Sequence, residues 1–109
     1  MNVFNWVNGH FSNRGKALTL YRRGMARMKN RDHHGAIDDY TTTIAIPDAP
    51  ADVKAMALYN RALAFAAGRE DPKATEGIDA VLAMKGALPN VKTEARRLLV
   101  RMQRRSSNR

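Results

Sequence analysis

Residues 16–24, which read KALTLYRRG, return as residues 54–62, which read KAMALYNRA, with five of the nine residues identical. We call the spacing of 38 residues between Lys16 and Lys54 the repeat offset. The same spacing pairs Ala36 with Ala74 and Ile44 with Leu82 further along the chain. An internal repeat of this length and helical periodicity is typical of stacked helical hairpins, each of which buries its apolar face against its neighbour. The repeat therefore predicts an all-α protein built from antiparallel helical hairpins.

Turn and cap residues divide the chain into five expected helices. Ser12, Asp32 and Asp71 are expected N-caps, residues 47–50 (PDAP) interrupt the pattern, and Gly68 and Gly86 are expected C-terminal stops. We therefore expect helices over residues 13–30, 33–46, 51–67, 72–84 and 91–105. Gly24 lies inside the first of them, where a glycine permits a neighbouring helix to approach closely.

These helices suggest a domain organisation. Residues 1–13 form an N-terminal aromatic arm, expected to fold back and bury Phe4 and Trp6, with a dimer or partner contact as the alternative. Residues 14–105 form the helical domain, with repeat one over 16–46, repeat two over 54–84 and a capping helix over 91–105. Residues 106–109 are expected to be a frayed tail.

The composition excludes several classes of protein. The 109 residues are 44% hydrophobic and 27% charged, which is typical of one small globular domain. There is no cysteine, so disulfides and thiolate sites are excluded. No apolar run approaches the length of a membrane span, and the first residues do not resemble a signal peptide. We therefore expect a cytoplasmic protein that does not enter a membrane.

Basic residues are concentrated toward the two ends of the sequence. Residues 14–31 carry seven basic residues and no acid, and residues 92–109 carry seven against one acid, Glu94. The net charge is +9, and residues 32–90 hold nine of the ten acids. This asymmetry predicts attraction to an acidic protein surface or to a polyanion, with a role in solubility alone as the alternative.

The hairpins resemble the tetratricopeptide repeat. The matching positions are Leu20, Gly24, Ala36 and Tyr40 in the first unit and Leu58, Ala62, Ala74 and Ile78 in the second. The resemblance covers residues 16–84, and the last helix resembles the capping helix of such arrays. It implies a right-handed α-α superhelix whose concave groove binds a protein or peptide, so the expected function is that of an adaptor or scaffold.

The resemblance also implies groove residues. Tyr21, Met25, Tyr59 and Asn60 are the expected contacts, and Arg22 and Arg61 are expected to steer an acidic peptide. Some members of the family clamp a peptide carboxylate. Asn60 matches the second-repeat asparagine of that clamp, and Lys92 and Arg96 resemble its third-repeat pair, whereas Tyr21 and Met25 occupy the first-repeat lysine and asparagine positions.

Two alternatives remain at the level of sequence. A basic stripe formed by Arg97, Arg101 and Arg104 suits phosphate contacts, which makes a nucleic-acid-associated module the second hypothesis. A structural subunit of a larger assembly is the third, and self-association is a further expectation. We expect no enzyme activity, cofactor or metal site, because His33 and His34 point about 100° apart on a helix and cannot chelate one ion together.

Overall fold

The computed structural model describes residues 12–108, and all regular structure in this part of the chain is helical. The elements are α2 (Asn13–Lys29), α3 (His33–Ala45), α4 (Ala51–Ala67), α5 (Asp71–Ala83) and α6 (Pro89–Ser107). The all-α prediction is thus confirmed. The expected aromatic arm lies outside the described residues, apart from Ser12 and Asn13, which instead cap and begin α2.

The helix ends agree with the sequence-based prediction at two N-caps and differ from it at the start of α5 and at the end of α6. The side chains of Ser12 and Asp32 accept the backbone N–H groups of Gly15 and Gly35, each at 3.0 Å. The residue before α5 is Glu70, so Asp71 is the first helical residue rather than the expected cap. Its carboxylate binds Arg105 instead.

The helix α6 also runs further than expected. It begins at Pro89 and continues through Ser106 and Ser107, where the sequence predicts a frayed tail. The hydroxyl of Ser107 donates a hydrogen bond to the backbone carbonyl of Gln103 at 2.9 Å. This bond to the preceding turn is one way in which serine is accommodated within a helix.

The repeat offset is reproduced in the backbone. The same step that takes Lys16 to Lys54 carries the bounds of α2 and α3 onto the bounds of α4 and α5. The two hairpin turns are also alike, because Asp32 N donates to Arg27 O and Glu70 N donates to Phe65 O, both at 2.8 Å. Arg31 and Arg69, at equivalent positions, each adopt a left-handed conformation with φ of 62°.

The same offset places α6 in a third unit. The N–H groups of Lys16, Lys54 and Lys92, which are related by the repeat offset, bond the carbonyls before their respective helices. The start of α6, Pro89, likewise follows the start of α4 by one repeat offset. We therefore treat α2, α4 and α6 as equivalent first helices, and α3 and α5 as equivalent second helices.

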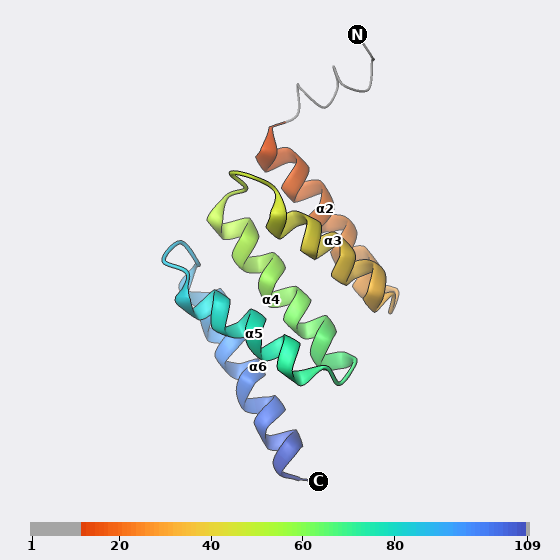
Figure 1. Ribbon diagram of the computed structural model, residues 1–109, viewed down its shortest axis with the longest axis vertical. Coiled ribbons are helices and arrows are strands. Elements are labelled where there is room, and N and C mark those ends of the chain that lie inside the picture. Colours follow the sequence, from red (N-terminus) through yellow and green to blue (C-terminus); the bar gives the residue numbers. More distant parts are fainter. Residues whose placement is uncertain (1–11, 109) are drawn as a thin grey trace.

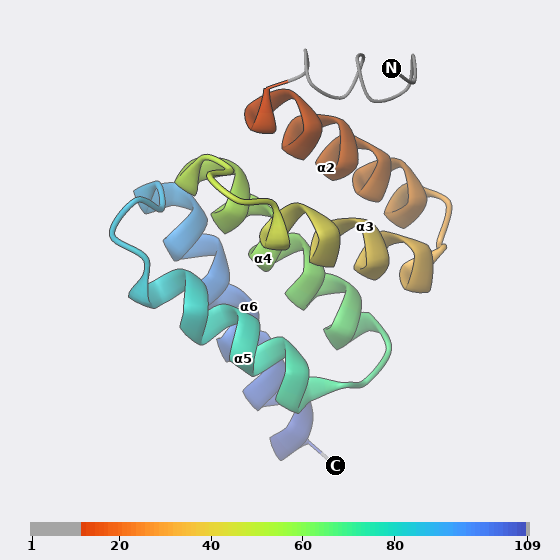
Figure 2. The same cartoon turned by 45° about the horizontal axis from the view of Figure 1, so that its top comes forward.

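Two apolar cores share α4. The first core joins α2, α3 and α4 through Ala17, Tyr21, Ala36, Tyr40, Val53 and Ala57. The second core joins α4, α5 and α6 through Leu58, Ala62, Ala74, Ile78, Val81, Ala95, Leu98 and Met102. Figure 1 shows α4 between α3 and α5, and Figure 2 shows α6 behind α5. Because α4 buries residues in both cores, it couples the two hairpins.

Gly24 marks the closest approach of α2 and α3. A Cβ atom at this position would lie 2.6 Å from Cε1 of Tyr40, which is fully buried. The Tyr40 ring therefore occupies the space that any larger residue at position 24 would need. The hydroxyl of Tyr40 is buried without a hydrogen-bond partner among residues 12–108. Burial, together with the nearby Tyr21 and Asp39, raises the pKa of Tyr40 to about 12.

A buried carboxylate joins the same two helices by charge. Asp39 of α3 is 3% exposed, and both of its oxygens accept hydrogen bonds from Arg23 of α2, at 2.7 and 2.9 Å. Arg27 adds a third bond at 3.3 Å. The bonds from Arg23 raise the pKa of that arginine. In the second hairpin the position equivalent to Asp39 is Gly77, so this cluster belongs to the first hairpin alone.

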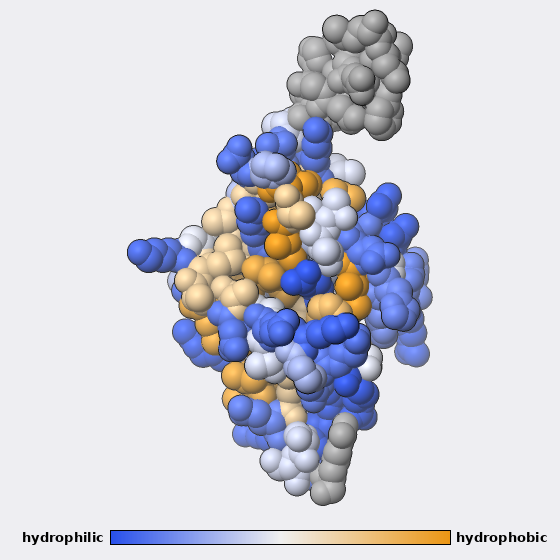
Figure 3. Space-filling model, viewed as in Figure 1, coloured by the Kyte–Doolittle hydropathy of each residue, from blue (hydrophilic) through white to orange (hydrophobic). Residues whose placement is uncertain are grey.

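The surface is polar around the hairpin ends. Figure 3 shows hydrophilic residues over the turn between α2 and α3, at the right of the view, and apolar ones near the end of α3 and the start of α4. No helix within residues 12–108 has both the length and the apolar character needed to cross a bilayer.

Candidate functional site

One face of the three first helices carries several of the residues expected to bind a partner. Positions related by the repeat offset lie on the same side of each helix, because equivalent helices share one register. We call this set the inner face, and its residues are Leu18, Tyr21 and Met25 on α2, Met56, Tyr59 and Leu63 on α4, and Glu94, Arg97 and Arg101 on α6.

A hydrogen bond between side chains connects the inner face of α2 to α4. Asn60 Nδ2 donates to the hydroxyl of Tyr21 at 3.0 Å and to the backbone carbonyl of Met56 at 2.9 Å. Tyr21 is 8% exposed, and its burial raises its pKa despite the opposing effect of this bond. Asn60 and Tyr21 are therefore brought together as expected, but they bind each other. Their arrangement matches a helix-packing role for Asn60.

The exposed part of the inner face changes in chemistry from α2 to α6. Met25 is 40% exposed, and Tyr59 and Leu63 are half-buried against the second core. The equivalent positions on α6 hold Arg97 and Arg101, which are both exposed. Thioether, aromatic and aliphatic side chains thus give way to guanidinium groups along one direction of the molecule.

Arg61 lies away from this face. Its guanidinium donates to Thr41 Oγ1 of α3 at 3.1 Å and stands 5.8 Å from the centre of the Phe65 ring. Burial lowers the pKa of Arg61, and the charge of Glu76 on α5 partly opposes that effect. The side chain therefore points to the side of α4 that α3 and α5 cover. The structure therefore does not place the guanidinium beside Tyr59 on the inner face.

Arg22 stays beside the inner face without belonging to it. It is exposed and occupies the α2 position equivalent to Asn60, next to Tyr21 in the chain. Within residues 12–108 it has no ion-pair partner. Its charge is therefore free to attract an acidic group to the part of the inner face that α2 forms.

Lys92 and Arg96 are out of register with Asn60. The α6 residue equivalent to Asn60 is Leu98, which is 4% exposed in the second core. Arg96 precedes Leu98 by two positions, which rotates its side chain by about 200° around the helix. Asn60, Lys92 and Arg96, which resemble part of a carboxylate clamp in sequence, therefore do not lie on one face, because the sequence match between them is displaced by two positions.

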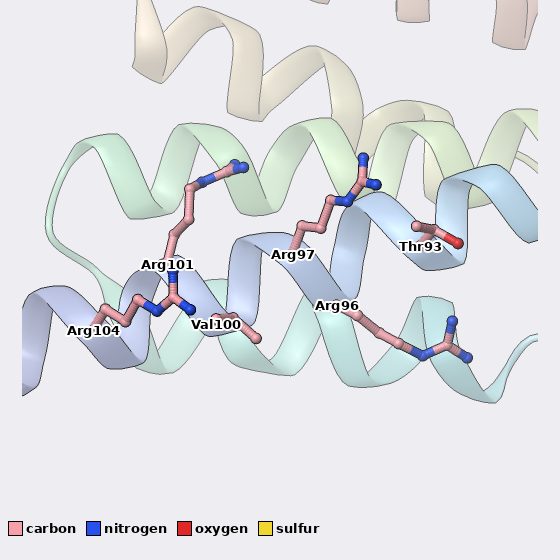
Figure 4. A pocket seen from close by; sticks show the side chains of 6 residues that line it. All are labelled: Thr93, Arg96, Arg97, Val100, Arg101 and Arg104. Carbon is pink, nitrogen blue, oxygen red and sulfur yellow. The ribbon is translucent and has the colours of Figure 1, made fainter.

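Two arginines of the predicted basic stripe, Arg97 and Arg101, belong to the inner face, and the third, Arg104, lies on the outer side of α6. Together with Thr93, Arg96 and Val100, they line a shallow hollow of ≈ 450 Å³. In Figure 4, Arg97 and Arg101 extend to one side of α6, Arg96 extends to the other, and Arg104 lies along the helix toward Val100. Arg97 is paired with Glu94 at 2.7 Å, so the stripe is partly neutralised at that end.

A second hollow, of ≈ 500 Å³, lies between the two hairpin turns. Residues lining it include Asp32, His33, His34 and Glu70. Across the described range, 12–108, no three His, Cys, Asp or Glu side chains form a group able to hold a metal ion. The carboxylate of Asp32 is already bound to Gly35 N at the start of α3.

Sequence reasoning missed several surface residues. Leu18, Met56 and Leu63 on the inner face and Val100 in the hollow on α6 were not candidates, because each is apolar and resembles a core residue in a helical pattern. The signal that finds them is the repeat offset, which shows the face on which each residue lies. Val100 is 42% exposed, whereas its equivalents Gly24 and Ala62 are buried.

Comparisons with family models, with curated proteins and with solved structures returned no match for this chain. Functional inference therefore depends on the geometry and charge of the surfaces described above.

Proposed function

We propose that this protein is an interaction module, an adaptor or scaffold that binds an acidic peptide segment of a partner protein along the inner face. The observation that carries the proposal is the order of chemistry on that face. The side chains on α2 and α4 are apolar or aromatic, whereas α6 carries Arg101 and an Arg97 that is paired with Glu94. A peptide that carries apolar residues followed by carboxylates complements this order.

The resemblance to tetratricopeptide repeats supports the same choice of surface. In that family the first helices of successive units form a concave groove, and here the inner face is made by the equivalent helices. The right-handed superhelix and the cytoplasmic location remain predictions. So does self-association.

The alternative is a nucleic-acid-associated module. Its support is the set of exposed cations on α6, Arg96, Arg101 and Arg104, for which no ion pair is recorded within residues 12–108. Against it, the hollow beside them contains no aromatic side chain on which a base could stack. We therefore favour the peptide.

The test is a fluorescence anisotropy titration at physiological salt with a labelled peptide in which a segment containing leucines is followed by a segment of glutamates. We expect Met25→Asp and Arg101→Glu each to weaken binding by about tenfold, since each removes a complementary contact and adds a repulsive charge. A peptide with glutamine in place of glutamate should bind the unaltered protein more weakly.

The matched control is Lys85→Glu, which makes the same change in charge at an exposed residue between α5 and α6. We expect it to leave the affinity within about twofold, because salt screens a distant surface charge. Equal losses for Lys85→Glu and Arg101→Glu would mean that only net charge matters, and the proposal would be abandoned.

A further inference from the structure

The outer side of α6 has a counterpart in each preceding hairpin. Four residues form the outer side of α6: Thr93, Arg96, Val100 and Arg104. We call these four residues the end face. By the repeat offset, their equivalents in α2 are Ala17, Leu20, Gly24 and Met28. Their equivalents in α4 are Ala55, Leu58, Ala62 and Ala66. In α2 and α4 the equivalent residues are buried or half-buried, whereas all four residues of the end face are exposed.

A second helix covers this position in both complete hairpins. Gly24 of α2 faces the Tyr40 ring of α3, and Ala62 of α4 lies 3.5 Å from the position of a Cβ on Gly77 of α5. Val100 is the equivalent of Gly24 and Ala62, but no helix among residues 12–108 covers it. Within residues 12–108 the third unit therefore has a first helix, α6, and no second helix packed on it.

The charges on the end face indicate the chemistry of that helix. Arg96 and Arg104 stand four positions before and after Val100, so one lies about 6 Å along the axis on either side of it. Leu58 and Ala66, their equivalents in α4, belong to the second core, where the residues from α5 are apolar. Arginines at these places require carboxylates in the helix that covers them, because an unpaired charge is costly to bury.

The first hairpin provides a precedent for such pairing. There Arg23 and Arg27 on the first helix hold Asp39, a buried carboxylate of the second helix. The same chain therefore already joins two packed helices through arginine and carboxylate. The guanidinium fork suits this contact, since it binds a carboxylate through two parallel hydrogen bonds.

We propose that the end face binds an acidic amphipathic helix of a partner protein, which takes the place of a second helix in the third unit. Its contact stripe carries a small residue opposite Val100 and carboxylates one turn to either side, opposite Arg96 and Arg104. A second copy of this chain using its own end face would place arginine against arginine. The end face contains none of the inner-face residues, although Arg97 and Arg101 of the inner face line the same hollow on α6. The proposal for the end face does not depend on the function proposed for the inner face.

The test uses the full chain and a labelled peptide with the sequence of α5 that carries Ala74→Glu, Gly77→Ala and Val81→Glu. The peptide keeps the helix that already fits a first helix of this fold and adds carboxylates on its contact stripe. We expect it to bind at least about tenfold more tightly than a control peptide with Ala74→Gln, Gly77→Ala and Val81→Gln. Its helicity should rise on binding.

Two double variants distinguish this site from general electrostatic attraction. Arg96→Glu with Arg104→Glu should weaken peptide binding by about tenfold or more, while Lys16→Glu with Lys29→Glu, the same charge change on α2, should alter it less than about threefold. Val100→Glu gives an independent test and should also abolish binding. Far-UV circular dichroism checks that each variant folds.

Three results would overturn the proposal. Equal losses in the two double variants would show attraction to net charge. An undiminished affinity in Val100→Glu would place the peptide elsewhere. A single-stranded oligouridine that binds more tightly than the peptide and loses affinity in the Arg96→Glu and Arg104→Glu double variant would assign the end face to nucleic acid.

Discussion

At the scale of single residues, Tyr40 is the most constrained side chain of the first core. Its ring fills the space left by Gly24 and packs against Tyr21, with ring centroids 5.9 Å apart. Its hydroxyl has no hydrogen-bond partner within the described chain. A buried hydroxyl of this kind costs free energy relative to its hydrated, unfolded state. The ring therefore stabilises the fold while the oxygen opposes it.

We expect Tyr40→Phe to raise the free energy of unfolding by about 1 kcal/mol, because it removes the unpaired oxygen and keeps the ring. Urea denaturation followed by circular dichroism at neutral pH measures the change. Tyr40→Leu, which removes the ring as well, should be destabilising. A loss of stability in Tyr40→Phe would show that the hydroxyl makes a favourable contact.

The same substitution predicts a pH dependence. The pKa of Tyr40 is about 12 in the folded protein, above the value of about 10 for an unfolded tyrosine. The folded state thus prefers the neutral form, and this contribution is complete below pH ~10 and is lost as the pH rises toward ~12. Relative to Tyr40→Phe, the unaltered protein should lose about 1.4 kcal/mol per pH unit in that window. The measurement is the free energy of unfolding of both proteins as a function of pH. If the two values changed in parallel between pH ~10 and ~12, the prediction would be wrong.

Arg69 carries backbone strain at the turn between α4 and α5. Its φ of 62° is a conformation that favours glycine, since a Cβ atom crowds the following carbonyl. We expect Arg69→Gly to raise the free energy of unfolding by about 0.5–1 kcal/mol. Arg69→Ala, which keeps the Cβ atom, is the control and should bring no such gain in thermal denaturation.

At the scale of elements, the two hairpins follow the same plan with different contacts. The first joins its helices through Gly24 against Tyr40 and through Asp39 with two arginines. The second places Gly77 on the other helix and has no carboxylate at the position of Asp39. Only the first hairpin is therefore tightly packed around its helix-embedded glycine.

A matched pair of substitutions tests this difference. Gly24→Ala should lower the free energy of unfolding by about 1–2 kcal/mol, because its methyl group would meet the immobile Tyr40 ring at 2.6 Å. Gly77→Ala should raise it by about 0.5–1 kcal/mol, since its nearest neighbours are at ordinary contact distances of 3.4 and 3.5 Å and alanine favours the helix. Chemical denaturation of both variants measures these changes in the free energy of unfolding. A stabilising Gly24→Ala would show that the Tyr40 ring does not limit the size of residue 24.

At the scale of the whole molecule, α4 links the two cores, and we expect this link to make the unfolding of the two hairpins cooperative. One side of α4, with Val53 and Ala57, belongs to the first core, and another, with Leu58 and Ala62, belongs to the second. Neither core is complete without this helix. The two hairpins should therefore unfold together, as neighbouring units of a short array do when their interface is strong.

Ile78→Ala tests this coupling from the second core. The side chain is fully buried, so the substitution should lower the free energy of unfolding by about 2–5 kcal/mol. The substitution is made in a Tyr59→Phe background, because Tyr59 packs against the second core. The tyrosine signal in near-ultraviolet circular dichroism then comes from Tyr21 and Tyr40 of the first core, and far-ultraviolet signals report on all helices. Coincident midpoints for the two signals are expected. A near-ultraviolet midpoint that stayed at its original value would show that the hairpins unfold separately.

The helices and their repetition follow from local sequence. Periodicity, caps and the repeat offset are properties of short stretches, so residues 16–24 and their copy at 54–62 were enough to place the helices closely and to predict the close approach at Gly24. Tyr21 and Asn60 are selected by the resemblance to the tetratricopeptide repeat, which supplies the groove positions.

The direction in which each side chain faces came from the packing of the helices against one another. Arg61 contacts α3, Asn60 binds Tyr21, and Arg96 is rotated away from both. Such contacts depend on the rotation and spacing of helices that are distant in sequence, and a displacement of two positions reverses a face. The exposure of Val100 was hidden for the same reason, since an apolar residue in a helical pattern reads as core until the neighbouring helices are in place.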